Sequence, residues 1–155
     1  MNSGDEKLKG VRGWLLLFCF SLTVLDPVAV IVNLFTAADA AKPYFAQDPG
    51  LMRLVLANGV AGIALSVFSL YAGISLWRRL PGAPAVARKY LLTVLAYSVL
   101  APFLPHLLGP TKLGGSRESF ALVSINSLFT ILYVGAWYLY LDRSRRVRAT
   151  YGEDR

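Results

Sequence analysis

The chain alternates four long apolar stretches with short polar segments. The apolar stretches lie at residues 14–35, 54–77, 90–108 and 119–141. A helix of about 20 residues crosses a hydrocarbon core of about 30 Å, so each stretch is long enough to span a membrane. The pattern predicts an all-α fold, an integral membrane four-helix bundle, with a short segment at 1–13 before it and a basic tail at 142–155 after it.

The connections between the predicted spans contain residues that end helices. Pro81 and Gly82 lie between the second and third spans, and Pro110 and Gly114 lie between the third and fourth. The first connection, residues 36–53, is longer and includes aromatic residues. We expect it to form a loop whose aromatic side chains anchor it at the membrane surface, and packing over the mouth of the bundle is the alternative.

The composition favours a membrane protein over the soluble classes. Of the 155 residues, 55% are hydrophobic and only 16% are charged, and the mean hydropathy is +0.51. So few charges do not coat a water-soluble domain of this size. The apolar composition also excludes a disordered chain, the lack of heptads excludes a coiled coil, and the single cysteine excludes a disulfide-rich fold.

Positive charge is distributed unevenly between the two sides of the predicted bundle. The segment before the first span, the 78–89 connection and the tail together carry 12 of the 16 Lys and Arg residues. Because cytoplasmic segments retain positive charge during insertion, the imbalance predicts both termini in the cytoplasm, the N-in/C-in topology. The aromatic residues agree, since amphipathic rings favour the headgroup region. Those assigned to this side include Trp14, Trp77, Trp137 and Tyr90.

The first apolar stretch has one competing interpretation, a cleaved signal peptide. A basic start, an apolar run and the Ala-Asp-Ala sequence at 38–40 resemble the cleavage pattern. The run from Trp14 to Phe35 is longer than a typical signal core, and the chain begins at Met1. We therefore expect this segment to be retained as the first span.

One polar residue from each span is a candidate for a functional site: Asp26, Asn58, His106 and Asn126. Asp26 is the only acidic residue inside a span, and a lone carboxylate at mid-bilayer costs about 2.5 to 3.5 kcal/mol on insertion scales. At about 1.5 Å of rise per residue, all four residues lie in the outer half of the bundle. They therefore form a candidate outward-facing polar pocket. The alternative is structural: Asp26 is hydrated near the headgroups, His106 caps its helix, and both Asn residues pack helices.

Small residues four positions apart mark one face of the second span. Gly62 and Ser66 form one pair, and Ser69 and Gly73 form another. Such pairs let two helices approach closely in a membrane. We expect these four helix-packing residues to contact a helix of the same chain, and contact with another subunit is the alternative.

The sequence lacks the residue patterns of catalysis, metal binding and cofactor binding. Cys19 is the only cysteine and His106 the only histidine, which excludes zinc clusters, bis-histidine haem ligation and a two-histidine iron site within this chain. No GxSxG, Walker or HExxH motif occurs. We therefore expect no catalytic residue, no metal site and no cofactor, and a chain that is not an enzyme.

The net charge of +7 raises the question of nucleic-acid binding. The basic residues lie directly against the span ends, without interleaved aromatic residues on a soluble face, so nucleic acid is not an expected partner. A basic cluster at the start of the tail suits anionic lipid headgroups, at about 1 kcal/mol per residue near the surface. Its members are Arg143, Arg145, Arg146 and Arg148.

Both ends of the chain resemble a known bacterial family. The opening GVRGWLLL at 10–17, followed by Pro27, resembles the GxxGWLxL...P start of the inner-membrane family called domain of unknown function 2569. The aromatic-rich last span and the tail from Ser144 to Tyr151 resemble that family's S-x-R-V-x-x-T-F ending, with Tyr151 in place of Phe. The resemblance implies a small four-span protein of the bacterial inner membrane and no particular activity. The two matching ends either form one docking surface on the cytoplasmic side or each anchor their own helix.

These inferences predict a non-enzymatic, multi-pass protein of the bacterial inner membrane. The favoured function is an accessory or assembly subunit of a larger membrane complex, with membrane lipids and other membrane-protein subunits as its partners. The alternative is a small transporter or lipophilic-ligand binder that uses the candidate polar pocket. The first function predicts co-purification with partner subunits, and the second predicts an enclosed outer cavity with apolar walls and the four polar residues in its lining.

Overall fold

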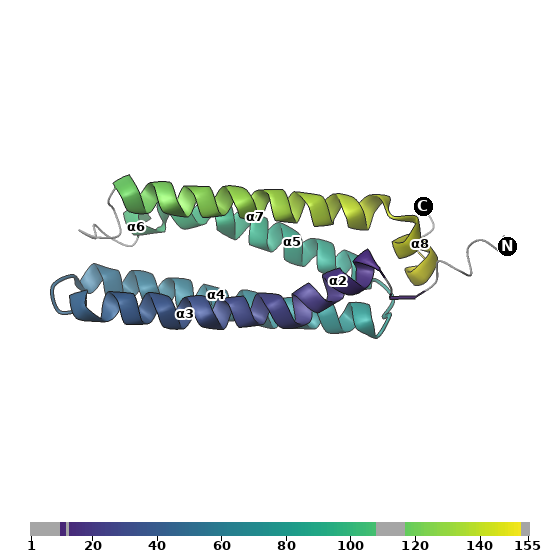
Figure 1. Ribbon diagram of the computed structural model, residues 1–155, viewed down its shortest axis with the longest axis horizontal. Helices are drawn as coiled ribbons and strands as arrows, with labels where there is room; N and C mark the ends of the chain where they lie inside the picture. The colour runs from purple at the N-terminus through teal and green to yellow at the C-terminus, as the bar shows by residue number, and fades with distance from the viewer. Residues whose placement is uncertain (1–9, 12, 108–116, 153–155) are drawn as a thin grey trace.

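The computed structural model describes residues 10–11, 13–107 and 117–152. Long helices lie along one axis, and successive ones run in opposite directions (Figure 1). The helices are α2 (Trp14–Phe20), α3 (Asp26–Ala41), α4 (Pro49–Trp77), α5 (Ala83–Leu100), α6 (Leu104–Leu107), α7 (Arg117–Arg143) and α8 (Arg145–Tyr151). Three short segments accompany them, the π-helix η1 (Ser21–Leu25) and the 3-10 helices η2 (Lys42–Tyr44) and η3 (Ala101–Phe103). No strand occurs within the described residues, and the predicted all-α fold is confirmed.

Four segments of the described chain are long and apolar enough to cross a membrane. They are Trp14–Tyr44, Pro49–Trp77, Ala83–Phe103 and Ser124–Arg143. Large apolar side chains point outward from them, among them Phe35, Val60 and Phe129, which are 66%, 69% and 67% exposed. Soluble proteins do not expose apolar side chains in long rows, so the bundle is that of a multi-pass membrane protein.

Proline and capping residues determine where the helices begin. Asp48 caps α4, and its Oδ1 accepts hydrogen bonds from the backbone N–H groups of Gly50 and Leu51 at 3.1 and 3.3 Å. Pro49 takes the first helical position, where no intrahelical donor is needed. Gly82 precedes α5 with a φ of 78°, a left-handed conformation that glycine adopts without strain. Gly82 thus allows a short connection between α4 and α5, from residue 78 to residue 82.

The helices extend beyond the predicted apolar spans. The first helical segment continues past residue 35 to Ala41, and α4 begins at Pro49 rather than at residue 54. Likewise, α5 begins at Ala83 rather than at residue 90. The prediction of a long loop at 36–53 is therefore wrong. Hydropathy marks only the part of a helix that suits hydrocarbon, whereas the backbone hydrogen bonds continue through the polar turns at its ends.

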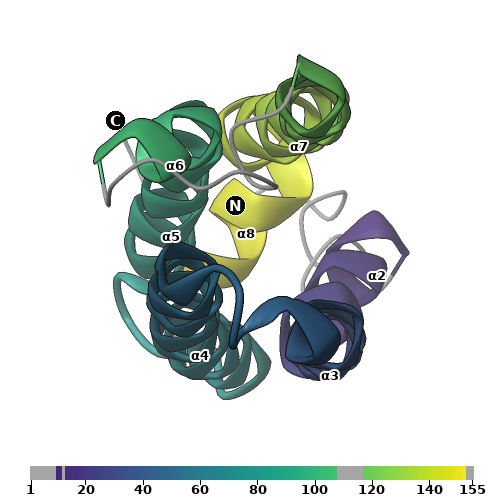
Figure 2. The same ribbon diagram turned by 90° about the vertical axis from the view of Figure 1, so that its left-hand side faces the viewer.

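The long helices form a ring that is loose on one side (Figure 2). α3 packs along α4, α4 packs along α5, and α5 packs along α7. Between α3 and α7, by contrast, the described residues make little contact. The ring therefore has its loose side between α3 and α7.

Most of the fully buried side chains among the described residues lie toward the end of the bundle that carries α8. Fully buried side chains gather there from five helices, among them Leu15, Phe18, Leu76, Leu141 and Val147. Phe18 also stacks on Trp137 with the ring centroids 4.6 Å apart, which joins α2 to α7. The loose side is therefore closed near α8 and opens only farther along the bundle.

The short helix α8 turns back across the end of the bundle and meets the beginning of the chain (Figure 1). The Tyr151 hydroxyl donates to the Leu76 carbonyl at 2.7 Å, and the Gly10 N–H donates to Thr150 Oγ1 at 3.2 Å. Burial raises the pKa of the Tyr151 hydroxyl, so it stays a neutral donor. The two family-like ends therefore contact each other, which favours one joint surface over two separate anchors.

Candidate functional site

The first span changes helix type in its middle, at η1 just before Asp26 and Pro27. The Asp26 N–H donates to the carbonyl of Ser21, five residues earlier, as in a π-helix. The next bond in this series needs an N–H at position 27, and proline has none. The Leu22 carbonyl therefore lacks this helical donor, and the hydroxyl of Ser69 on α4 donates to it at 2.8 Å instead.

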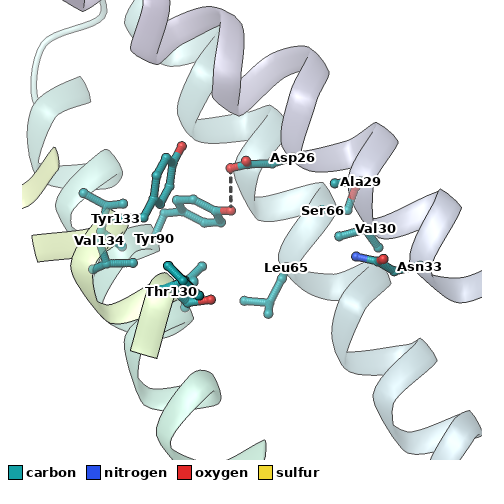
Figure 3. Close-up of a pocket in the computed structure, with 13 residues that line it drawn as sticks. Asp26, Ala29, Val30, Asn33, Leu65, Ser66, Tyr90, Thr130, Tyr133 and Val134 are labelled. Atoms are coloured by element: carbon teal, nitrogen blue, oxygen red, sulfur yellow. Dashed lines mark hydrogen bonds between the residues drawn. The ribbon is translucent and has the colours of Figure 1, made fainter. Parts of the chain in front are cut away.

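The Asp26 carboxyl group lies against two hydroxyl groups from neighbouring helices, and Figure 3 shows the one from Tyr90. Tyr90 Oη on α5 donates to Asp26 Oδ2 at 3.0 Å, and Ser69 Oγ lies 3.3 Å from the same oxygen. The Ser69 hydroxyl has a single hydrogen, which it donates to the Leu22 carbonyl, so Tyr90 is the main donor to the carboxyl group. No Lys, Arg or His side chain within the described part of the chain contacts Asp26. Asp26 is thus a half-buried acidic group with no positive partner among the described residues.

A cavity of about 400 Å³ lies beside Asp26, in the middle of the bundle. We call it the first cavity. Four helices line it: Asp26, Ala29, Val30 and Asn33 from α3, Leu65 and Ser66 from α4, Tyr90, Leu91 and Val94 from α5, and Phe129, Thr130, Tyr133 and Val134 from α7. Sites for small ligands have volumes of about 300 to 1,000 Å³ and mostly apolar walls with a few converging polar groups. The first cavity has both properties.

The first cavity opens on the loose side of the bundle. Its exposed lining residues are Ala29 and Asn33 on α3 and Phe129 and Tyr133 on α7, whereas the lining residues of α4 and α5 are buried or half-buried. Toward α8, the Tyr133 and Ser21 hydroxyls lie 2.6 Å apart in a hydrogen bond that joins α7 to η1. In a membrane this side of the bundle faces hydrocarbon, so the cavity has a lateral entrance from the lipid.

A second cavity, also of about 400 Å³, continues from the first toward the end opposite α8. The two cavities share Val30 and Asn33. Asn58 lines the second cavity, where its Nδ2 donates to the Leu54 carbonyl at 2.9 Å and its Oδ1 accepts from Tyr97 Oη at 2.6 Å. Both polar atoms of the Asn58 amide therefore have partners within the chain, whereas Asp26 Oδ1 has none in the described part of it.

Of the four residues that the sequence prediction placed in one pocket, the structure places Asp26, Asn58 and Asn126 apart from one another. Asp26 lines the first cavity and Asn58 lines the second. Asn126 is exposed and lines neither of them. The side chain of His106 lies outside the described residues.

Asp26 also lies at a different depth from the predicted one, in the half of the bundle nearer α8. Its neighbour Ser69 is eight residues from the end of α4 at Trp77, about 12 Å along the helix. Asn58 lies about 16 Å farther along α4. The prediction counted residues along a straight helix from Trp14, whereas the π-helical turn η1 lets α2 tilt away from α3 (Figure 1).

The predicted helix-packing residues lie along one face of α4: Gly62, Ser66, Ser69 and Gly73. A Cβ atom added at Gly73 would lie 2.5 Å from Thr23 Cγ2, and one added at Gly62 would lie 3.3 Å from Val30 Cγ1. Ser69 is fully buried against η1, and Ser66 lines the first cavity. This face of α4 therefore lies against the first span of the same chain.

The basic cluster of the tail lies on and beside α8. Arg143, Arg145 and Arg148 are exposed, and Arg146 is half-buried. Val147, on the opposite face of α8, is fully buried in the core. The exposed arginines therefore lie at the end of the bundle where Gly10 meets α8, and their contact with anionic lipid stays a prediction.

The family resemblance at the two ends extends over the whole helical region. The family described as protein of unknown function (DUF2569) matches residues 8–152. The chain belongs to this family. No curated protein and no solved structure matches the chain.

Sequence reasoning missed the tyrosines that hold the site of this DUF2569 chain. Tyr90, predicted to lie at the membrane surface, is buried and binds Asp26. Tyr97 and Tyr133 lie inside the predicted spans, and each hydroxyl bonds a side chain of another helix. A hydroxyl inside a span needs a partner, so the position of these tyrosines within apolar stretches is the signal that identifies them.

The lining of the first cavity is suited to recognition by charge and hydrogen bonding. Within the described residues, no group of three or more His, Cys, Asp or Glu side chains is placed to hold a metal ion. The polar groups that line the first cavity are Asp26 and neutral side chains such as Tyr90 and Thr130. The site therefore combines one acidic group, several neutral polar groups and apolar walls open to lipid.

Proposed function

We propose that this DUF2569 protein binds a small lipophilic ligand in the first cavity, within the bacterial inner membrane, and that it does so without catalysing a reaction. The observation that carries the proposal is the cavity: about 400 Å³, with apolar walls from four helices and one acidic group in its lining. The lateral entrance between α3 and α7 admits a ligand from the lipid phase. The ligand therefore reaches the site without crossing water.

Small residues on facing helices favour the interpretation of the first cavity as a ligand site rather than as a packing defect. Helix bundles pack their interiors densely, and voids much larger than a water molecule are few. Ala29 on α3 and Ser66 on α4 both line the first cavity, and a larger side chain at either position would project into it. Small residues at these positions on two helices therefore keep the first cavity open, as a binding site requires.

Purification in a mild detergent, followed by mass spectrometry of the extracted small molecules, tests the proposal. Val94 lines the first cavity, so Val94→Phe is expected to lower the amount of bound ligand per mole of protein several-fold. Val99→Phe is the matched control, because Val99 lies on the same helix, is 50% exposed and lines neither cavity. If the unmodified protein carries no small molecule that is depleted in Val94→Phe, the proposal is wrong.

An accessory or assembly function is the second candidate, and the surface around α8 favours it. The contact between Gly10 and Thr150 combines both chain ends in one surface, and Arg145 and Arg148 are exposed on it. The same purification, read for proteins, tests this function with the double variant Arg145→Glu/Arg148→Glu. A subunit that co-purifies with Val94→Phe but not with the double variant supports an accessory function. If a subunit co-purifies equally with both variants, this surface is not its docking site.

A further inference from the structure

We propose that the ligand of the first cavity is a lipophilic amine whose protonated nitrogen pairs with the Asp26 carboxylate. This inference rests on the proposed function and names the chemical class of the ligand. Its basis is the juxtaposition of an acidic group that has no positive partner among the described residues, aromatic rings and apolar walls in one lipid-accessible cavity.

The Asp26 carboxyl group has an oxygen left for a ligand. Tyr90 and Ser69 both approach Oδ2, and no group in the described part of the chain hydrogen-bonds Oδ1. A carboxylate removed from water is costly unless a positive charge accompanies it. Because the described residues supply no such charge, a cationic ligand completes the site.

The rest of the lining indicates that the ligand carries no negative charge. Neither cavity has a Lys or Arg in its lining, and the polar groups other than Asp26 are neutral hydroxyls and amides. A phosphate or carboxylate headgroup would find no positive partner there and would face Asp26. Phospholipids and fatty acids are therefore poor ligands, whereas an amine matches the only charge in the lining.

Aromatic side chains add to the attraction for a cation. Tyr90, Tyr133 and Phe129 line the first cavity together with Asp26. An ammonium group is attracted to the faces of such rings, and more strongly where water is excluded. A protonated nitrogen in the first cavity therefore has both a counter-ion and an aromatic surrounding.

The second cavity provides room for an apolar tail. It shares Val30 and Asn33 with the first cavity and continues along α4 to the level of Asn58. That level is about 16 Å along α4 from Ser69, the neighbour of Asp26. A linear amine can thus pair its nitrogen with Asp26 and extend its alkyl chain along α4.

Calorimetric titration of the protein in phosphatidylcholine nanodiscs tests the inference, with empty nanodiscs as the blank. The probes are N,N-dimethyldodecylamine and 1-dodecanol, which share a chain length and differ in charge at neutral pH. We expect the amine to bind about 30-fold more tightly than the alcohol, the size of effect typical for a desolvated charge pair. Asp26→Asn is expected to abolish this preference. Asp39→Asn, at an exposed acidic position of the same helix outside both cavities, is expected to keep it.

Tyr90→Phe provides a second variant in case Asp26→Asn does not fold. It removes the main hydrogen bond to the carboxyl group and keeps the charge, so the preference for the amine is expected to persist. Loss of the preference in Tyr90→Phe would contradict the assignment to charge. Equal binding of amine and alcohol, unchanged in Asp26→Asn, would overturn the amine inference and leave the lipophilic cavity intact. Binding of neither probe, with identical extracts from the unmodified protein and Val94→Phe, would overturn both proposals.

Discussion

Ser69 supports the first span at the point where the span breaks its own hydrogen bonding. Its hydroxyl donates to the Leu22 carbonyl, which Pro27 leaves without the π-helical donor, and its oxygen lies beside Asp26. Backbone groups at membrane depth must be satisfied within the protein, because hydrocarbon offers no partner. A single serine on α4 therefore maintains both the irregular turn and the surroundings of the acidic group.

Removing this hydroxyl is expected to destabilise the protein. Ser69→Ala leaves the Leu22 carbonyl without its donor, a loss of about 1 to 3 kcal/mol in the free energy of unfolding. Titration of the detergent-solubilised protein with dodecyl sulfate, followed by circular dichroism, measures the change. Ser66→Ala lies on the same face of α4 but replaces a serine that makes no such bond, and it is expected to change stability little. Equal effects of the two substitutions would contradict this function of Ser69.

The sequence predicts some of the polar residues of the site and fails to predict others. Asp26 stands out because a carboxyl group inside an apolar stretch needs a special environment. Its neighbours Ser69 and Tyr90 do not stand out, because serine is common in helix interfaces and tyrosine is common near span ends. The contacts between them depend on the tilt produced by η1, and a π-helical turn has no hydropathy signature.

At the scale of helices, α4 is the element against which the others are arranged. It packs on α2, η1 and α3 on one side and on α5 on the other. Its approach to η1 depends on Gly73, because a Cβ atom there would also lie 3.3 Å from the backbone nitrogen of Thr23. The absence of a side chain at Gly73 thus lets α4 reach the irregular turn.

A methyl group at this position is expected to force α4 away from η1. Gly73→Ala is expected to lower the free energy of unfolding by about 1 to 3 kcal/mol, as overpacking does in dense interiors. The same dodecyl sulfate titration measures it. Gly135→Ala on α7 is the matched control, since nothing lies within 4 Å of a Cβ atom at that position. If Gly73→Ala is as stable as the unmodified protein, the close approach does not limit packing.

The sequence predicts the number of membrane-spanning helices better than it predicts where each helix begins and ends. The four spans follow from hydropathy, because each helix must be apolar over the thickness of the hydrocarbon. The turns at either end, such as the helical residues after Phe35 and before Leu54, carry polar side chains that hydropathy counts as loop. Caps such as Asp48 and Pro49 define these ends better than hydropathy does.

For the whole molecule, the main architectural fact is that the first and the last described residues lie at one end of the bundle. The α4–α5 connection, with Arg78 and Arg79, lies at this end as well, next to Gly10 and α8 (Figure 1). The exposed arginines of the tail therefore share one side with these residues. The charge imbalance predicts that this side faces the cytoplasm.

Labelling of single cysteines in intact cells tests the orientation. Gln47→Cys lies in the connection before α4 and Arg145→Cys lies on α8, at opposite ends of the bundle. A membrane-impermeant maleimide is expected to label position 47 in intact cells and position 145 only after the cells are permeabilised. Cys19 is fully buried and serves as the unlabelled background. The reverse pattern would show that the bundle has the opposite orientation.

The joining of the two chain ends also orders the steps of biosynthesis. The Gly10 N–H and the Leu76 carbonyl form their hydrogen bonds only after Thr150 and Tyr151 have been synthesised. A chain is synthesised from its N-terminus, so all four spans precede the residues that complete their shared end. The contacts at this end of the bundle are therefore completed only after all four spans have been synthesised.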